Sequence, residues 1–166
     1  MAEQTKTASK LSLPSDREIV GSRIMDATPE LVFKAYTDPE LIPRWWGPRR
    51  YATTVDKMDV RPGGVWRFVH RAADGGEYAF NGVYREIVPP KRLVYTFNYE
   101  GAPGHEAVET VTFEEAEGGK TRMTDHLLFE TREERDGMLN SGMEEGAAET
   151  IDRLAELLRE LQAGER

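Results

Sequence analysis

The stretch from Tyr51 to Phe129 constrains the fold most, because its apolar residues alternate with polar ones in short segments that end at turn residues. A spacing of two places alternate side chains on one face of a β-strand. For example, Trp66, Phe68 and His70 share one face, and Asp74-Gly75-Gly76 follows as a hairpin turn. The same pattern recurs along the stretch without a helical interruption. It predicts about six consecutive antiparallel strands.

A strand and two short helices are predicted before this stretch. Residues 17–25 alternate loosely and indicate a first strand. Thr28 fits a helix N-cap, because a proline and an acidic residue follow it directly. Residues 37–40 repeat this start and predict a second short helix through Trp45, which Gly47-Pro48 ends.

One long helix is predicted at the C-terminal end. From Arg132 onward, apolar residues recur at the three-and-four spacing of one helical face. They are Leu139, Met143, Ile151, Leu154, Leu158 and Leu161. A curved sheet must cover its apolar face, and no other predicted element is long enough to do so. The predicted fold class is therefore α+β, with a curved antiparallel sheet of about seven strands wrapped around the C-terminal helix.

The chain of 166 residues fits one domain by size. We assign this domain to residues 16–162. Residues 1–15 are polar and are expected to form a flexible N-terminal tail. Residues 163–166 are expected to form a short C-terminal tail.

The middle of the predicted C-terminal helix lacks bulky side chains on its apolar face. Gly142, Gly146, Ala147 and Ala148 stand where a core helix normally carries larger residues. A glycine inside a helix costs about 1 kcal/mol relative to alanine, so two of them indicate a packing or functional reason. Two explanations stay open. Either the sheet approaches the helix closely here, or a cavity lies beneath it.

Several stretches of the sequence resemble one known family. They are Ala27–Phe33, Thr37–Glu40 with Trp45–Pro48, Asp59–Trp66, Gly82–Ile87, Arg92–Thr96, Gly142–Gly146 and Asp152–Leu154. Together they resemble the START-like (SRPBCC) superfamily, specifically bacterial proteins similar to the activator of the ninety-kilodalton heat-shock chaperone ATPase. The resemblance implies a helix-grip fold with a hydrophobic cavity between sheet and helix. Such proteins often carry tryptophan after the second glycine of the helix motif, where this chain has Ala147.

Aromatic residues on the predicted inward strand faces are the main candidates for ligand contacts. They are Trp66, Phe68, Tyr78, Phe80, Tyr95, Phe97 and Tyr99. Met143 and Ala147 would lie opposite them on the helix. Trp45 and Trp46 are expected to divide, with one in the core and one at the rim beside residues 101–106. The alternative for each aromatic side chain is ordinary core packing.

His70 and Asp125 are the candidate polar groups of the cavity. Asp125 shares a strand face with Met123 and Leu127, and a buried carboxylate is costly unless it is paired. A β-bulge would instead place Asp125 outside. If both side chains face inward, they are expected to orient a ligand hydroxyl or to act as general acid and base.

Composition excludes several classes of function. The net charge of −8 argues against sequence-independent nucleic-acid binding, which needs clustered lysine and arginine. The absence of cysteine excludes disulfides, thiolate nucleophiles and cysteine-ligated zinc. The three histidines lack metal-ligand spacing, so no metal site and no cofactor are predicted. No apolar run is long enough to span a bilayer, and we expect a cytoplasmic protein without membrane contacts.

The sequence favours a non-enzymatic domain that binds a hydrophobic small molecule, such as a lipid, polyketide-like or drug-like compound. The first alternative is an enzyme of the cyclase or hydrolase type that uses the same cavity. The second is a chaperone-interacting regulator, which rests on the resemblance alone. The oligomeric state stays open, and the resemblance is compatible with a homodimer.

Overall fold

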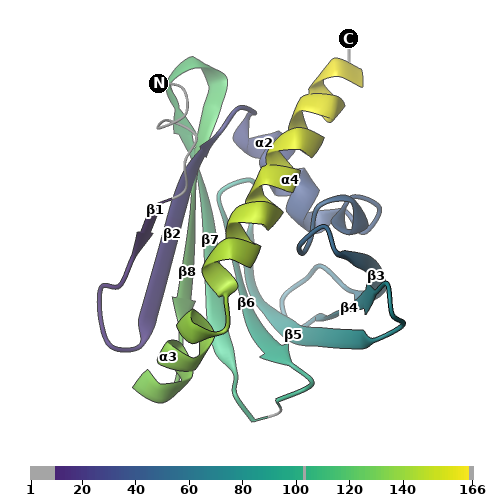
Figure 1. The fold of residues 1–166 in the computed structure, drawn as a ribbon. Coiled ribbons are helices and arrows are strands. Elements are labelled where there is room, and N and C mark those ends of the chain that lie inside the picture. Colours follow the sequence, from purple (N-terminus) through teal and green to yellow (C-terminus); the bar gives the residue numbers. More distant parts are fainter. Residues whose placement is uncertain (1–9, 103, 165–166) are drawn as a thin grey trace.

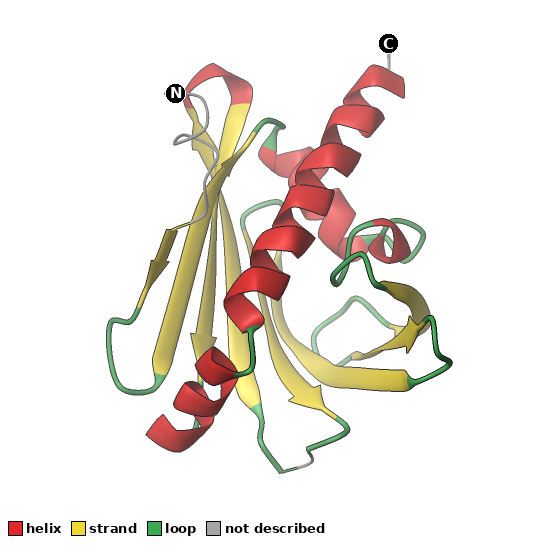
Figure 2. Ribbon diagram, viewed as in Figure 1, coloured by secondary structure: helices red, strands yellow, loops and turns green. Residues whose placement is uncertain are grey.

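A computed structural model describes residues 10–102 and 104–164, in which an eight-stranded antiparallel sheet has the order β1-β2-β8-β7-β6-β5-β4-β3. The strands are β1 (Lys10–Ser12), β2 (Glu18–Met25), β3 (Tyr51–Met58), β4 (Val65–Ala72), β5 (Glu77–Val88), β6 (Arg92–Tyr99), β7 (Ala107–Ala116) and β8 (Lys120–Leu128). Figure 1 shows the long C-terminal helix crossing between β1, β2 and β8 on one side and β3 and β4 on the other. Figure 2 shows how strongly the sheet bends around this helix. The predicted α+β helix-grip fold is confirmed.

The sheet has one strand more than expected, because β1 pairs with β2 at its edge. Lys10 lies opposite Ser22 in this register, and Ser12 lies opposite Val20. Three residues of the segment assigned to an N-terminal tail therefore belong to the sheet. Residues 1–9 of that segment lie outside the described residues. At the other end, the last helix continues to Gly164, two residues into the assigned C-terminal tail.

Of the two short helices predicted after β2, only the first forms an α-helix. Helix α2 (Pro29–Thr37) begins as expected, since the Thr28 hydroxyl accepts a hydrogen bond from the backbone N–H of Leu31 at 3.4 Å. The second helix is only a 3₁₀ turn, η1 (Ile42–Arg44), and stops before Trp45. The backbone N–H of Trp45 closes this turn on the carbonyl of Ile42. A further 3₁₀ turn, η2 (Glu117–Gly119), joins β7 to β8.

The prediction of one continuous C-terminal helix was wrong. Two helices, α3 (Arg132–Asn140) and α4 (Met143–Gly164), are separated at Ser141 and Gly142. Gly142 has φ +86°, a left-handed conformation that ends α3 and lets α4 start in a new direction. Glycine is suited to this position because other residues rarely adopt that φ.

The main hydrophobic core lies beneath the C-terminal half of α4. Leu154, Leu157 and Leu158 are its buried residues in this helix. In the N-terminal half, Met143–Ile151, every residue is half-buried or exposed. This half of α4 therefore stands off the sheet and leaves room on its inner side. None of the helices in the described part of the chain combines the length and apolar character needed to cross a bilayer.

Candidate functional site

In the described part of the chain, two separate cavities large enough for a small molecule lie on the inner side of the sheet. The larger, here called the aromatic cavity, has a volume of about 690 Å³, and the smaller, here called the acidic cavity, about 380 Å³. No residue lines both of them. Both volumes fall in the range of about 300–1,000 Å³ that is typical of small-molecule pockets.

A small hydrophobic cluster forms the wall between the two cavities. Its buried members are Ile19, Ala107 and Phe129, with Leu127, Met138, Leu139 and Met143 packed against them. Ile19, Leu127 and Met143 also line the acidic cavity. Ala107, Phe129 and Met138 line the aromatic cavity. The wall thus consists of residues from β2, β7, β8, α3 and α4 together with Phe129.

The aromatic cavity takes its sheet side from rings on β3, β4, β5 and β6. These rings belong to Tyr51, His70, Tyr78, Phe80, Phe97 and Tyr99. Strand register brings them together, because His70 lies opposite Tyr78 and Phe80 lies opposite Tyr99. The rings of Tyr51 and His70 stack at 4.9 Å and 12°, and Phe80 lies 4.9 Å from His70 and 5.2 Å from Tyr99. The result is a continuous aromatic surface.

Helix α3 supplies the opposite side of the aromatic cavity with Glu133, Glu134, Gly137 and Met138. Gly137 and Ser141 line it, and a Cβ added at Gly137 would meet no atom within 4 Å. Glu134 and His105 also line the cavity, and Glu134 Oε2 lies 2.7 Å from His105 Nδ1. Thr131 caps the start of this helix, since its hydroxyl accepts a hydrogen bond from the backbone N–H of Glu134 at 3.1 Å.

His70 is the buried titratable group of the aromatic cavity. Burial, together with the charges of Arg153 and Arg50, lowers its pKa to about 4, so the ring is neutral at pH 7. Its Nε2 is buried without a hydrogen-bond partner in the described residues. A Cβ at Gly47 would lie only 2.4 Å from this nitrogen. The ring edge therefore requires glycine at position 47.

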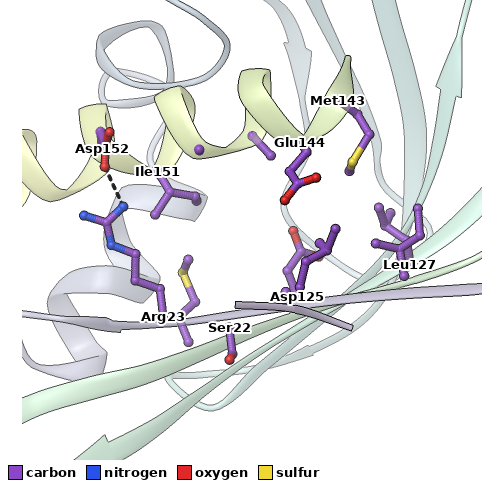
Figure 3. A pocket seen from close by; sticks show the side chains of 14 residues that line it. Ser22, Arg23, Asp125, Leu127, Met143, Glu144, Ile151 and Asp152 are labelled. Atoms are coloured by element: carbon purple, nitrogen blue, oxygen red, sulfur yellow. Dashed lines mark hydrogen bonds and ion pairs between the residues drawn. The ribbon is translucent and has the colours of Figure 1, made fainter. Parts of the chain in front are cut away.

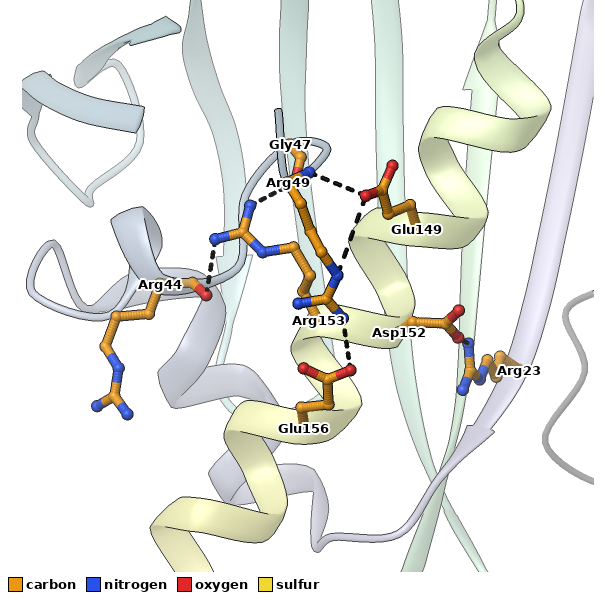
Figure 4. A network of polar contacts seen from close by, with 8 residues as sticks. All are labelled: Arg23, Arg44, Gly47, Arg49, Glu149, Asp152, Arg153 and Glu156. Atoms are coloured by element: carbon orange, nitrogen blue, oxygen red, sulfur yellow. Dashed lines mark hydrogen bonds and ion pairs between the residues drawn. The ribbon is translucent and has the colours of Figure 1, made fainter. Parts of the chain in front are cut away.

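A network of arginine contacts holds α4 against the loop that carries Gly47. Arg153 donates from Nη1 to the Gly47 carbonyl at 2.6 Å and from Nη2 to the Arg44 carbonyl at 3.1 Å. Arg49 pairs with Glu156 at 2.5 Å, and its backbone N–H donates to Glu149 (Figure 4). Because most of these side chains are exposed, their role is to position the helix and the loop rather than to add much stability.

The acidic cavity lies between α4 and the strands β1, β2 and β8. Met143, Ala147 and Ala148 form part of its helix side. In Figure 3, the carboxylate of Asp125 points from the sheet towards α4 and faces that of Glu144. At the other end of the cavity Arg23 forms an ion pair with Asp152 at 2.6 Å (Figure 3).

Asp125 belongs to a buried carboxyl pair with Glu109. On β7, Val111 lies opposite Asp125, and Glu109 is two residues before Val111 on the same face. Burial raises the pKa of Glu109 well above its usual value, and the charge of Asp125 and a hydrogen bond with it add to this. Burial also raises the pKa of Asp125, although the hydrogen bond with Glu109 opposes that rise. Both carboxyl groups of the pair therefore hold a proton more readily than exposed carboxyl groups do.

Comparisons with known proteins agree with this architecture. The model of the family described as Activator of Hsp90 ATPase homolog 1-like protein matches residues 26–159. This chain belongs to that family. No curated protein is significantly similar to it. Membership supports a ligand-binding or regulatory domain in general.

Solved structures of bacterial proteins share the fold over nearly the whole chain. A crystal structure from Rhodobacter sphaeroides is 27% identical with a TM-score of 0.85, and the match covers 92% of this chain and 99% of that one. A solution structure from Arthrobacter aurescens is 26% identical with a TM-score of 0.84 and 91% of each chain covered. A crystal structure from Mycobacterium smegmatis is 25% identical with a TM-score of 0.80, covering 92% and 96%.

In this member of the Hsp90-activator-like family, the predicted site residues divide into four groups. His70, Tyr78, Phe80, Phe97 and Tyr99 line the aromatic cavity. Asp125, Met143 and Ala147 line the acidic cavity. Trp46, Trp66, Phe68 and Tyr95 surround a void of only about 20 Å³, which has room for no more than a water molecule. Trp45 is buried in the core, where its indole N–H donates to the Ala35 carbonyl.

Three expectations about the arrangement of these residues were wrong. His70 and Asp125 do not meet, because β4 and β8 are separated by three strands and the two side chains line different cavities. The predicted aromatic side chains that line a cavity face α3 rather than the glycine and alanine patch of α4. Trp46 is not at a rim beside residues 101–106, since it packs among Trp66, Phe68, His70 and Phe80.

The sequence analysis missed Glu109 and the α3 side of the aromatic cavity. Glu109 could have been found, because it alternates with Ala107 and Val111 on the inward face of its strand. Gly137 could not have been separated from other helix glycines by pattern alone. Among the described residues, no group of three or more histidine and carboxylate side chains is arranged to hold a metal ion.

Proposed function

We propose that this protein binds a flat, largely apolar small molecule in the aromatic cavity. The observation that carries the proposal is the set of six rings, continuous across four strands, that faces α3 over a space of about 690 Å³. Stacking and apolar burial would supply most of the affinity, at about 25 cal/mol per Å² of apolar surface removed from water.

Polar groups at the edge of the cavity favour a ligand with one or two hydroxyl or carbonyl groups. The imidazole of His70 is part of the lining and is neutral at pH 7, and its buried Nε2 atom faces Gly47. A neutral imidazole offers one donor and one acceptor. Tyr51, Tyr78 and Tyr99 bring further hydroxyl groups to the lining. A planar ligand with a polar substituent fits this combination.

The alternatives have less support. An enzyme that uses His70 and Asp125 together as general acid and base would need them in one cavity, and they line two. A chaperone-interacting regulator rests on family membership alone.

A cavity-filling variant tests the proposal. In a thermal-unfolding assay with 2-naphthol, a ligand at ten times its Kd should stabilise the protein by about 1.4 kcal/mol, or roughly 3–6 °C. Gly137→Leu places a side chain in the cavity, at a position where an added Cβ meets no atom within 4 Å. This variant should abolish the shift by 2-naphthol while it keeps or raises the melting temperature of the free protein.

Ala147→Leu is the matched control, because it adds a similar side chain to the acidic cavity. The shift by 2-naphthol should survive in this variant. A shift that survives in Gly137→Leu, or one that disappears in Ala147→Leu, would contradict the assignment of the ligand to the aromatic cavity.

A further inference from the structure

The acidic cavity combines an apolar lining with an excess of negative charge. Its lining includes Ile19, Met123, Leu127, Met143 and Ile151 as apolar residues. Its ionisable side chains are Arg23, Asp125, Glu144 and Asp152. Three of these four are acidic, so the lining carries a formal charge of about −2 when all are ionised.

Only one of the three acidic side chains of the acidic cavity has a basic partner among the described residues. Arg23 pairs with Asp152 at 2.6 Å, so the positive charge is neutralised at that end of the cavity. In the described part of the chain, Asp125 and Glu144 form no ion pair with any basic side chain. These two carboxylates face each other from the sheet and from α4 (Figure 3). A cation between them would pair with both.

Asp125 has an unused hydrogen-bond acceptor inside the protein. Its Oδ1 is buried and has no partner among the described residues. A buried acceptor without a partner is costly, and such atoms in native structures need an explanation. Burial raises the pKa of Asp125, and the hydrogen bond with Glu109 opposes that rise. A protonated amine beside Asp125 would favour its ionised form and would give the buried Oδ1 atom a hydrogen-bond donor.

We propose that the acidic cavity is a second binding site, for an apolar molecule that carries a protonated amine. The ammonium group would lie between Asp125 and Glu144 and donate to both. The hydrocarbon part would lie against Met143, Ala147 and Ile151 on α4 and against the apolar residues of β2 and β8. This site is independent of the ligand proposed for the aromatic cavity, since the two cavities share no lining residue.

Three probes of equal chain length separate the charge requirement from apolar burial. At pH 7, isothermal titration calorimetry would compare octylammonium, octanol and octanoate. Octylammonium should bind at least tenfold more tightly than octanol, and octanoate should bind most weakly. Higher salt should weaken the binding of octylammonium and leave that of octanol nearly unchanged. Equal affinities for octylammonium and octanol would overturn the proposal.

Paired variants on α4 test the location. Glu144→Gln should weaken octylammonium binding several-fold, whereas Glu145→Gln, at the next residue and outside the lining, should not. Ala147→Leu fills the cavity and should abolish binding of both octylammonium and octanol. Gly137→Leu fills only the aromatic cavity and should leave octylammonium binding intact. Equal effects of Glu144→Gln and Glu145→Gln, or a loss of binding in Gly137→Leu, would refute the site.

A further variant tests the role of the buried carboxylate. Asp125→Asn keeps the shape and removes the charge, so octylammonium should then bind no better than octanol. Far-ultraviolet circular dichroism checks that this variant is folded. If Asp125→Asn does not fold, the comparison of Glu144→Gln with Glu145→Gln tests the charge requirement instead. The aromatic-cavity proposal is tested with 2-naphthol and Gly137→Leu, whereas the amine site is tested with octylammonium and variants at residues 125, 144 and 147. Either proposal can therefore fail without the other.

Discussion

At the scale of single residues, strand alternation located the inward side chains but not their partners. It placed His70 beside Trp66 and Phe68 on the buried face, where all three lie. It could not show that Gly47, from a loop 23 residues earlier, touches the imidazole ring. Contacts of this kind depend on how the loop is held, here by Arg153 of α4, and no local pattern in the sequence records them.

The buried imidazole predicts a specific pH dependence of stability. His70 has a pKa of about 4 in the folded protein and an ordinary value of 6.5 when unfolded. Between these values only the unfolded state takes up the proton, so the free energy of unfolding falls as pH drops below 6.5. From pH 6.5 to 5, the loss should reach about 1–2 kcal/mol.

Urea unfolding at pH 6.5 and at pH 5 measures this effect, with His70→Gln as the comparison. The variant has no imidazole to protonate, so its loss of stability between the two pH values should be smaller by about 1–2 kcal/mol. The same loss in both proteins would show that His70 is not the group responsible.

The buried carboxyl pair shows another limit at this scale. Alternation correctly placed Asp125 inside, with Met123 and Leu127 on its face. Its partner Glu109 stands on the next strand of the sheet, 16 residues earlier in the chain. Only the register of β7 against β8 brings the two carboxyl groups together. Register between strands is set by the whole sheet and is not visible in either strand alone.

At the scale of elements, the strands and α2 were predictable and the C-terminal helices were only partly so. Apolar spacing continued across the break, because α3 and α4 both turn an apolar face inward. Gly137, Gly142 and Gly146 look alike in the sequence. Gly142 alone among them has a left-handed φ, and it separates the two helices.

The different conformations of Gly142 and Gly146 predict opposite effects of the same substitution. Gly142→Ala must place a Cβ at φ +86° and should destabilise the protein by about 1–2 kcal/mol. Gly146→Ala lies inside α4, where the nearest atom to a new Cβ is Pro48 Cγ at 3.6 Å, an ordinary contact distance. It should stabilise the protein by up to about 1 kcal/mol. Urea unfolding of both variants measures these changes, and equal signs would contradict the break at Gly142.

At the scale of the whole molecule, the helix-grip architecture followed from the order of elements and from the resemblance. The arrangement of the cavities in the interior was not predicted. We expected one cavity with aromatic rings opposite the glycine and alanine patch, and the protein has two cavities with a hydrophobic wall between them. The wall uses residues from both ends of the chain, including Ile19 and Met143. Its position depends on the bend at Gly142, which was itself not predicted.

Two separate cavities make a quantitative prediction for the intact protein. If each ligand is present at ten times its Kd, 2-naphthol and octylammonium should each stabilise the protein by about 1.4 kcal/mol. Independent sites then give about 2.8 kcal/mol for both ligands together. Competition for one continuous cavity would give only about 1.8 kcal/mol, because the two ligands would then exclude each other.

Thermal unfolding with each ligand alone and with both distinguishes these values, since 1 kcal/mol corresponds to roughly 2–4 °C in a domain of this size. The double variant Gly137→Leu/Ala147→Leu fills both cavities and should respond to neither ligand. Combined stabilisation near the lower value would mean that the wall of Phe129, Met138 and Met143 opens in solution. Combined stabilisation near the higher value would mean that the wall stays closed and that one helix-grip fold carries two binding sites of different chemistry.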